Sequence, residues 1–124
     1  MFPLAIELRA ECGSIEVATD VMATIAGGVA VDCYGVIGMV SQCQLKDSIT
    51  ELLKKDNFSK GVIVSQIEDK IIIDMYIIVS YGMKISEIAY DVQTKVQHRL
   101  DQMLGVDVDA VNIFVQGVRL TTVD

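Results

Sequence analysis

Apolar side chains recur three and four positions apart in two stretches of the chain, and this spacing predicts two amphipathic helices. The first helix is expected over residues 20–31. Thr19 is its expected cap, because the hydroxyl can accept a hydrogen bond from an otherwise unpaired backbone amide. Gly27 and Gly28 lower helix propensity and predict either close backbone packing or an early end. The apolar face of this helix consists of Met22, Ile25, Ala26 and Val29.

The second helix is longer and is expected over residues 84–104, with Gly105 supplying the left-handed residue that closes it. Asp91 lies four residues before Lys95 on its polar side, a spacing that predicts a weak ion pair. A short polar helix is also expected over residues 45–55. The apolar stripe of the long helix consists of Ile85, Ile88, Ala89, Val92, Val96, Leu100 and Met103.

Two neighbouring β-rich runs, residues 61–67 and 70–81, are separated only by Glu68 and Asp69. Runs this close together are expected to pair as an antiparallel hairpin. The run over residues 70–81 is mostly apolar on both of its faces. This pattern predicts a central strand that helices cover on one side.

A short strand is expected at residues 14–17, and another within residues 34–44 after a turn around Gly35. A last strand is expected where Val111, Ile113 and Val115 alternate with other residues. The order is therefore strand, helix, strand, short helix, two strands, long helix, strand. This order predicts a two-layer α+β fold, with helices packed on one mixed β-sheet. Residues 1–124 are expected to form a single domain. The order of strands within the sheet is left open.

The composition fits one folded domain. Of 124 residues, 52% are hydrophobic, which excludes a disordered chain. The longest stretch without a charged residue runs from Cys33 to Leu45, shorter than the roughly 18 apolar residues that a membrane-spanning helix needs. Residues 1–6 contain no basic residue and meet Glu7 too early for a signal peptide. We therefore expect a cytoplasmic protein without direct membrane insertion.

Acidic residues outnumber basic residues by 17 to 10, and the formal net charge is −7. This balance disfavours nucleic acid as a partner, because phosphate groups are bound by clustered Lys and Arg. The densest basic group, Lys54, Lys55 and Lys60, is expected to solvate a loop. The cysteines form no C-x-x-C pair and are expected to be buried or half-buried free thiols in a reducing compartment. They are Cys12, Cys33 and Cys43.

Side chains able to do chemistry are few and scattered. His98, beside Arg99, is expected to be an ordinary surface histidine. Asp107 and Asp109 share a face if their segment is extended, an arrangement that suggests acid–base catalysis or binding of a divalent ion. We favour the alternative, in which both are solvated loop residues just before the last strand. No phosphate-binding glycine loop, nucleophile elbow or zinc-binding helix motif is present. We therefore expect no catalytic residues, no metal site and no cofactor.

Asp74 is flanked by apolar residues in the expected central strand, and two interpretations are open. A buried Asp74 near Tyr76 and Tyr81 is typical of a small-molecule pocket. We favour the alternative, in which Asp74 lies on the open side of the sheet or bonds a neighbouring backbone group.

Gly35 and Gly38 form a G-x-x-G, the short loop with which KH domains clamp RNA. Four residues are a weak signal, and a KH loop joins two helices with basic residues nearby. Here Asp32 precedes the motif and a strand is expected to follow it. RNA binding is therefore only a third hypothesis.

Two sets of segments resemble the alkaline shock protein family of Gram-positive bacteria, also called envelope-stress-response proteins. The first set is residues 13–17, 21–27 and 34–39. The second and more specific set is residues 61–64, 73–82, 85–93 and 111–118. The chain departs from the family at residues 69–70, 103–105 and 33–35, which are turn and cap positions.

The resemblance implies a non-catalytic protein, associated with stress, that supports the cell envelope from the cytoplasmic side. Some members of the family self-associate and reach the membrane through an anchored partner. The mean hydropathy of +0.45 agrees with this, because a small domain of such composition exposes apolar patches that usually mark protein contacts. We therefore expect a homo-oligomeric scaffold that lies near the membrane only through a membrane-anchored protein partner. Small-molecule binding near Asp74 and Tyr76 is the second hypothesis, and RNA binding is the third.

Overall fold

The computed structural model describes residues 5–40, 61–68 and 70–120, which form six strands and two helices. This confirms the α+β class, and the order of the elements broadly follows the predicted one. The helix expected over residues 45–55 lies outside the described residues, as do Cys43, Lys54, Lys55 and Lys60. The elements are β1 (Ala5–Ala10), β2 (Gly13–Ala18), α1 (Thr19–Asp32), β3 (Val36–Met39), β4 (Val62–Ile67), β5 (Lys70–Ser80), α2 (Ile85–Leu104) and β6 (Ala110–Arg119).

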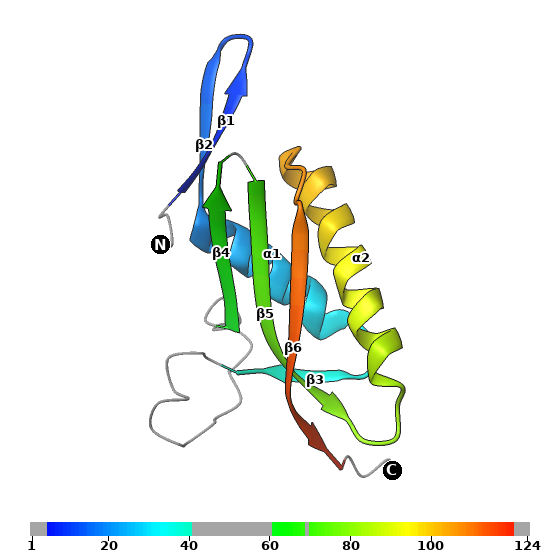
Figure 1. The fold of residues 1–124 in the computed structure, drawn as a ribbon. Helices are drawn as coiled ribbons and strands as arrows, with labels where there is room; N and C mark the ends of the chain where they lie inside the picture. The colour runs from blue at the N-terminus through cyan, green and yellow to red at the C-terminus, as the bar shows by residue number, and fades with distance from the viewer. Residues whose placement is uncertain (1–4, 41–60, 69, 121–124) are drawn as a thin grey trace, which may run out of the picture.

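β5 is the central strand of a four-stranded mixed sheet (Figure 1). β6 runs parallel to it along one side. On the other side, β4 pairs antiparallel with the first half of β5, and β3 pairs antiparallel with residues 77–79. The predicted hairpin of residues 61–67 and 70–81 and the predicted central strand are therefore confirmed.

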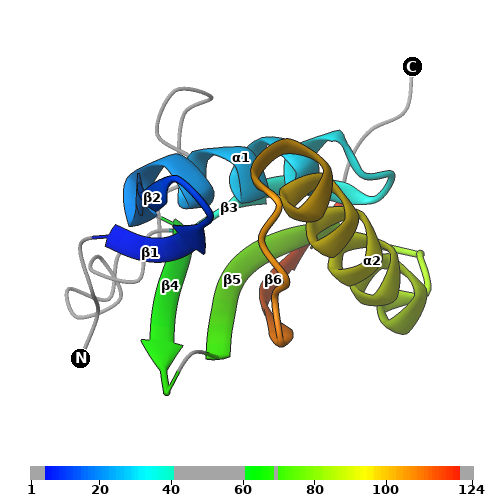
Figure 2. The ribbon, with the colours of Figure 1, turned by 90° about the horizontal axis from the view of Figure 1, so that it is seen from above.

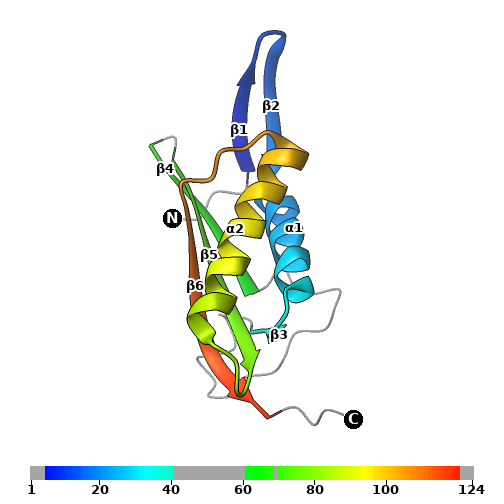
Figure 3. The ribbon, with the colours of Figure 1, turned by 90° about the vertical axis from the view of Figure 1, so that its right-hand side faces the viewer.

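Both helices pack on one face of this sheet, as the views in Figures 2 and 3 show. Alternate residues of β5 point toward the helices and are buried, because side chains of a strand alternate between its two faces. They meet buried side chains of α1 and α2 in one core. The β5 members of this core are Ile71, Ile73, Met75, Ile77 and Val79.

α2 follows the predicted stripe closely. Ile88, Val92, Val96 and Leu100 are buried, so four residues spaced one turn apart fix the helix on the sheet. The two ends of the stripe are exposed, Ile85 at 40% and Met103 at 57%. Gly105 has a φ of 68° and its amide donates to the Asp101 carbonyl oxygen at 2.9 Å, which is the predicted left-handed end of the helix.

α1 differs from its prediction in two details. Its N-cap residue is Ala18, so Thr19 is the first helical residue rather than the cap. The helix also continues through both glycines to Asp32, and Gly27 is buried. Of the two expectations for these glycines, close packing is therefore confirmed and an early end is wrong.

The prediction that all strands form one sheet is wrong for the N-terminal strands. The strand expected at residues 14–17 is present as β2, but it pairs antiparallel with β1 in a separate two-stranded sheet. This hairpin projects beyond the four-stranded sheet (Figures 1 and 3). β1 was not predicted from the sequence. Ile6 is fully buried and belongs to the core, so the base of the hairpin is attached to the body.

Candidate functional site

Three segments that lie far apart in the sequence meet at one end of the molecule. The Ser80 amide donates to the Gly35 carbonyl oxygen at 2.9 Å, and the Tyr81 amide donates to the Arg119 carbonyl oxygen at 2.9 Å. These bonds join the turn after α1, the end of β5 and the end of β6 (Figure 1). We call this region the apolar end, defined by the exposed side chains of Tyr34, Tyr81, Ile85, Val118 and Leu120.

Apolar exposure is concentrated at this end. Among the described residues, eleven large hydrophobic side chains are exposed, and the apolar end holds five of them. Tyr34 is 81% exposed and Tyr81 is 68% exposed. Tyrosine combines a large apolar ring with a hydrogen-bonding hydroxyl and is enriched in protein–protein interfaces. The apolar end is therefore a candidate contact surface for another protein.

Gly35 holds the turn of the apolar end in place. Its φ is +94°, and a Cβ atom at this position would lie 2.6 Å from Cδ1 of Ile88. Only a glycine allows the turn to pack this closely against α2. The G-x-x-G motif is thus a helix-to-strand turn, since Gly38 lies within β3 as the sequence analysis expected.

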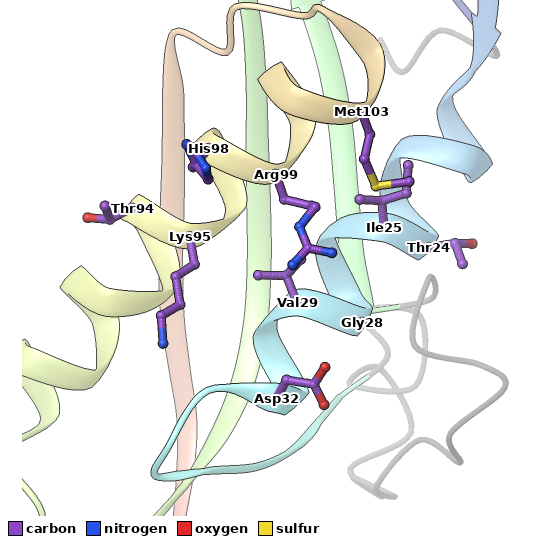
Figure 4. A pocket seen from close by; sticks show the side chains of 10 residues that line it. All are labelled: Thr24, Ile25, Gly28, Val29, Asp32, Thr94, Lys95, His98, Arg99 and Met103. Atoms are coloured by element: carbon purple, nitrogen blue, oxygen red, sulfur yellow. The ribbon is translucent and has the colours of Figure 1, made fainter.

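A groove of about 710 Å³ lies between α1 and α2 (Figure 4). Its apolar part is formed by Ile25, Gly28, Val29 and Met103. Ile25 and Val29 belong to the predicted apolar face of α1 and are only half-buried, because they also line this groove. The polar lining consists of Thr24, Asp32, Thr94, Lys95, His98 and Arg99.

The α2 side of the groove is basic. His98 is exposed there, as predicted, and Arg99 points from α2 toward α1 (Figure 4). Nζ of Lys95 lies 3.2 Å from Oδ2 of Asp91, which confirms the predicted ion pair. The hydrogen bond to Asp91 and the charge of Asp91 raise the pKa of Lys95. Among the described side chains, no ion pair forms with Arg99.

Asp74 and Tyr76 lie on the face of the sheet opposite the helices, so they do not line this groove. Asp74 is half-buried, and its Oδ1 accepts a hydrogen bond from Nδ2 of Asn112 at 2.8 Å. This confirms the favoured interpretation, in which Asp74 lies on the open side of the sheet. Tyr76 stacks on Phe114 with ring centroids 5.0 Å apart, and burial followed by the charge of Asp74 raises the pKa of Tyr76. Tyr81 belongs to the apolar end.

The other predicted candidates are dispersed. Asp107 and Asp109 are exposed just before β6, as expected for loop residues. Asp109 also has a structural role, since its Oδ2 accepts a hydrogen bond from the Ile71 amide at 2.8 Å. Cys33 is buried as predicted, and burial followed by the charge of Asp91 raises the pKa of its thiol. Cys12 is exposed between β1 and β2, so the expectation of burial is wrong for this residue.

Sequence reasoning missed both the groove and the apolar end. Each is formed by segments that lie far apart along the chain, and no local sequence pattern indicates which segments will be in contact. One signal was available for the apolar end: Tyr34 and Tyr81 each neighbour a glycine at the limit of a predicted element. Large side chains next to turns tend to be exposed, because turns lie on the surface.

Residues 7–120 match the sequence model of the alkaline shock protein 23 family, described as having a cell envelope-related function. YloU of Bacillus subtilis strain 168 is 58% identical over 118 residues, covering 95% of this chain and 98% of YloU. Spy1614 of Streptococcus pyogenes serotype M6 is 38% identical over 117 residues, covering 94% of this chain and 97% of Spy1614. YqhY of Bacillus subtilis is 32% identical over 110 residues, covering 89% of this chain and 80% of YqhY. All three are described as uncharacterized proteins.

No solved structure matches the chain. Within the described residues, neither helix is both long enough and apolar enough to cross a membrane.

Proposed function

The chain belongs to the alkaline shock protein 23 family, whose function is cell envelope-related, and from this premise we propose that it is a non-catalytic scaffold protein in the cytoplasm. In this role it forms homo-oligomers and binds a membrane-anchored protein partner. The association with the envelope then comes through that partner. The observation that carries the proposal is the concentration of exposed tyrosine and aliphatic side chains at the apolar end.

Burying the apolar end against another protein is energetically favourable. Removing apolar surface from water contributes about 25 cal/mol per Å². Tyrosines within an interface often supply a large part of its binding free energy. Tyr34 and Tyr81 are held on neighbouring turns by the bonds that join Ser80 to Gly35 and Tyr81 to Arg119, so little ordering is needed on binding.

The net charge favours a protein partner over lipid. At a formal charge of −7, the chain is repelled by the anionic lipids of a cytoplasmic leaflet. Peripheral proteins that bind such lipids directly use clusters of Lys and Arg. The basic residues in the groove are accompanied by Asp32 and Asp91, so their local excess of charge is small.

Binding to membranes with and without their proteins tests the proposal. Purified protein is sedimented with inside-out membrane vesicles from the host cell and, separately, with protein-free liposomes of the same lipids. We expect binding to the vesicles and none to the liposomes. A Tyr34→Ser/Tyr81→Ser variant is expected to bind the vesicles about tenfold or more weakly, a loss of at least about 1.4 kcal/mol.

Ile67→Ser is the matched control, because Ile67 is 58% exposed at the end of β4, beside the first residue of β5, whereas Tyr81 follows the last residue of β5. This variant is expected to bind like the wild type. Equal binding to vesicles and liposomes, or no binding to either, contradicts a protein partner. If the double tyrosine variant and the control bind alike, the apolar end is not the contact surface.

A further inference from the structure

β6 is an edge strand whose own sequence does little to protect it. Among the described elements it pairs only with β5, which lies on one side of it (Figure 1). From Ala110 to Val118 the strand contains no charged residue and no proline. Proteins commonly protect a long edge strand with such residues, because its unpaired backbone groups can bind a further strand. The outer edge of β6 is therefore a candidate site for pairing with another strand.

The free backbone groups of this edge belong to Ile113 and Val115. Nε2 of Gln93 donates to the Val111 carbonyl oxygen at 2.8 Å, so this carbonyl group points away from β5. Backbone groups alternate in direction along a paired strand, so those of Ile113 and Val115 point the same way as those of Val111. No donor or acceptor within the described residues bonds these outward groups. They lie just before the bulge between Val115 and Gly117, in the regular part of the strand.

Phe114 lies between these two residues and carries an exposed aromatic ring. It is 40% exposed on the sheet face opposite the helices, where it stacks on Tyr76 with ring centroids 5.0 Å apart. If two β6 strands pair antiparallel around this position, the two copies of Phe114 lie directly opposite each other. Aromatic side chains opposite each other on neighbouring strands stabilise the pair.

The charges at the two ends of β6 favour an antiparallel neighbour over a parallel one. Asp107 and Asp109 are exposed just before the strand, and Arg119 is exposed at its end. Lys70 is the cation of β5 at the acidic end, so acidic charge still exceeds basic charge there. Among the described side chains, no ion pair involves any of these four residues. Antiparallel pairing brings each Arg119 near the acidic end of the other strand, whereas parallel pairing would bring like charges together.

We propose that β6 of one copy pairs antiparallel with β6 of a second copy, with the two Phe114 side chains meeting at the two-fold axis. In this register the amide and carbonyl groups of Ile113 bond those of Val115 in the other copy, which satisfies the free groups of both edges. The two four-stranded sheets then continue into each other. Both copies use the same surface, so the contact is isologous and joins two copies, and larger species need another surface. This inference rests on the homo-oligomer proposed above and names one contact that forms it.

Charged substitutions at the axis test the contact. Phe114→Lys places two ammonium groups directly opposite each other, and Phe114→Glu does the same with two carboxylates. Each variant alone is expected to self-associate about tenfold or more weakly than the wild type in sedimentation experiments, because like charges repel across the strands. A 1:1 mixture of the two variants is expected to associate about tenfold or more tightly than either alone, since each mixed pair brings opposite charges together. Circular dichroism checks that both variants fold.

Ile67→Lys and Ile67→Glu are the matched controls. Ile67 is 58% exposed on the same face of the sheet, but it lies on β4, on the other side of β5. Both control variants are expected to self-associate like the wild type.

Hydrogen exchange in the wild type gives a second measurement that needs no substitution. The amides of Ile113 and Val115 are expected to exchange more slowly at concentrations where the protein assembles than after dilution, because the second copy then bonds them. Equal exchange at both concentrations overturns the contact even if the Phe114 variants do not fold.

The outcomes separate this inference from the scaffold proposal. A wild type that stays monomeric at high micromolar concentration overturns the β6 contact and homo-oligomerisation, while binding to the membrane partner is still judged by the vesicle experiment. If the wild type and both folded Phe114 variants assemble equally well, self-association stands and this contact is overturned. If the folded variants stay monomeric even when mixed, the antiparallel register around Phe114 is wrong. Slower exchange at Ile113 and Val115 that requires membrane vesicles means that a strand of the membrane partner binds this edge, which overturns pairing between copies.

Discussion

Gly35 turns the chain from α1 into β3 with a φ of +94°, which non-glycine residues adopt only under strain. A methyl group there would also lie 2.6 Å from Cδ1 of Ile88, which is buried beneath the turn. We expect Gly35→Ala to lower the free energy of unfolding by about 2–4 kcal/mol. Urea unfolding followed by circular dichroism measures this change.

Gly28→Ala is the matched control for Gly35→Ala. Gly28 lies inside α1, and no described atom beyond its chain neighbours and the nearby backbone of α1 lies within 4 Å of the position its Cβ would take. Alanine is favoured over glycine inside helices by about 1 kcal/mol, so this variant is expected to be slightly more stable than the wild type. Equal effects of the two substitutions would show that neither backbone strain nor the contact with Ile88 matters at Gly35.

Cys33 makes stability depend on alkaline pH. Burial and the charge of Asp91 raise the pKa of its thiol above the ordinary value of 9.0, so the folded protein holds this proton more tightly than the unfolded chain does. The protonated thiol contributes fully to stability when the pH is below the ordinary pKa. This contribution is lost as the pH rises through the raised pKa of the folded protein. We expect the free energy of unfolding to fall as the pH rises past the ordinary pKa of 9.0 and through the raised pKa, and to fall less in Cys33→Ser. Parallel pH profiles of the two proteins would contradict this.

At the scale of elements, α2 depends on one buried stripe. Leu100 is fully buried in the core, and Met103, nearly one turn later, is 57% exposed. Leu100→Ala leaves a cavity and is expected to cost about 2–5 kcal/mol of unfolding free energy. Met103→Ala removes a similar volume from an exposed position and is expected to cost about 0.5 kcal/mol or less. Thermal and urea unfolding compare the two variants, and similar losses would mean that α2 is not fixed by its buried face.

Elements were predictable where the pattern was long and local. The period of two in β5 runs through residues 71–77, and the four buried residues of α2 span residues 88–100, so a single burial pattern describes each element. β1 escaped prediction because the alternation of Ile6, Glu7 and Leu8 is too short to indicate a strand by itself. The groove could not be predicted, since it depends on how residues 24–32 meet residues 94–103, and packing between elements leaves no periodic signal in either segment.

At the scale of the whole molecule, the hairpin of β1 and β2 and the apolar end lie at opposite ends (Figure 1). The hairpin projects from one end of the four-stranded sheet, and the apolar end closes the other (Figure 1). Neither the hairpin nor the groove includes a residue of the apolar end. Copies that assemble through surfaces outside the apolar end can therefore still present Tyr34 and Tyr81 to a membrane-anchored partner. Assembly then places many copies of the apolar end on one scaffold, and such multivalency strengthens binding to a surface that carries many partner molecules.

This arrangement predicts that assembly and membrane binding can be separated by mutation. Tyr34→Ser/Tyr81→Ser is expected to self-associate like the wild type but to lose vesicle binding. Diluted below the concentration at which it assembles, the wild type is expected to bind vesicles with a weaker apparent affinity, because only one apolar end engages at a time. Sedimentation and vesicle binding of the tyrosine variant and of the wild type measure both properties. If the tyrosine variant loses both properties, the apolar end also carries the contact between copies. If the apparent affinity of the wild type for vesicles does not change with dilution, assembly contributes nothing to membrane binding.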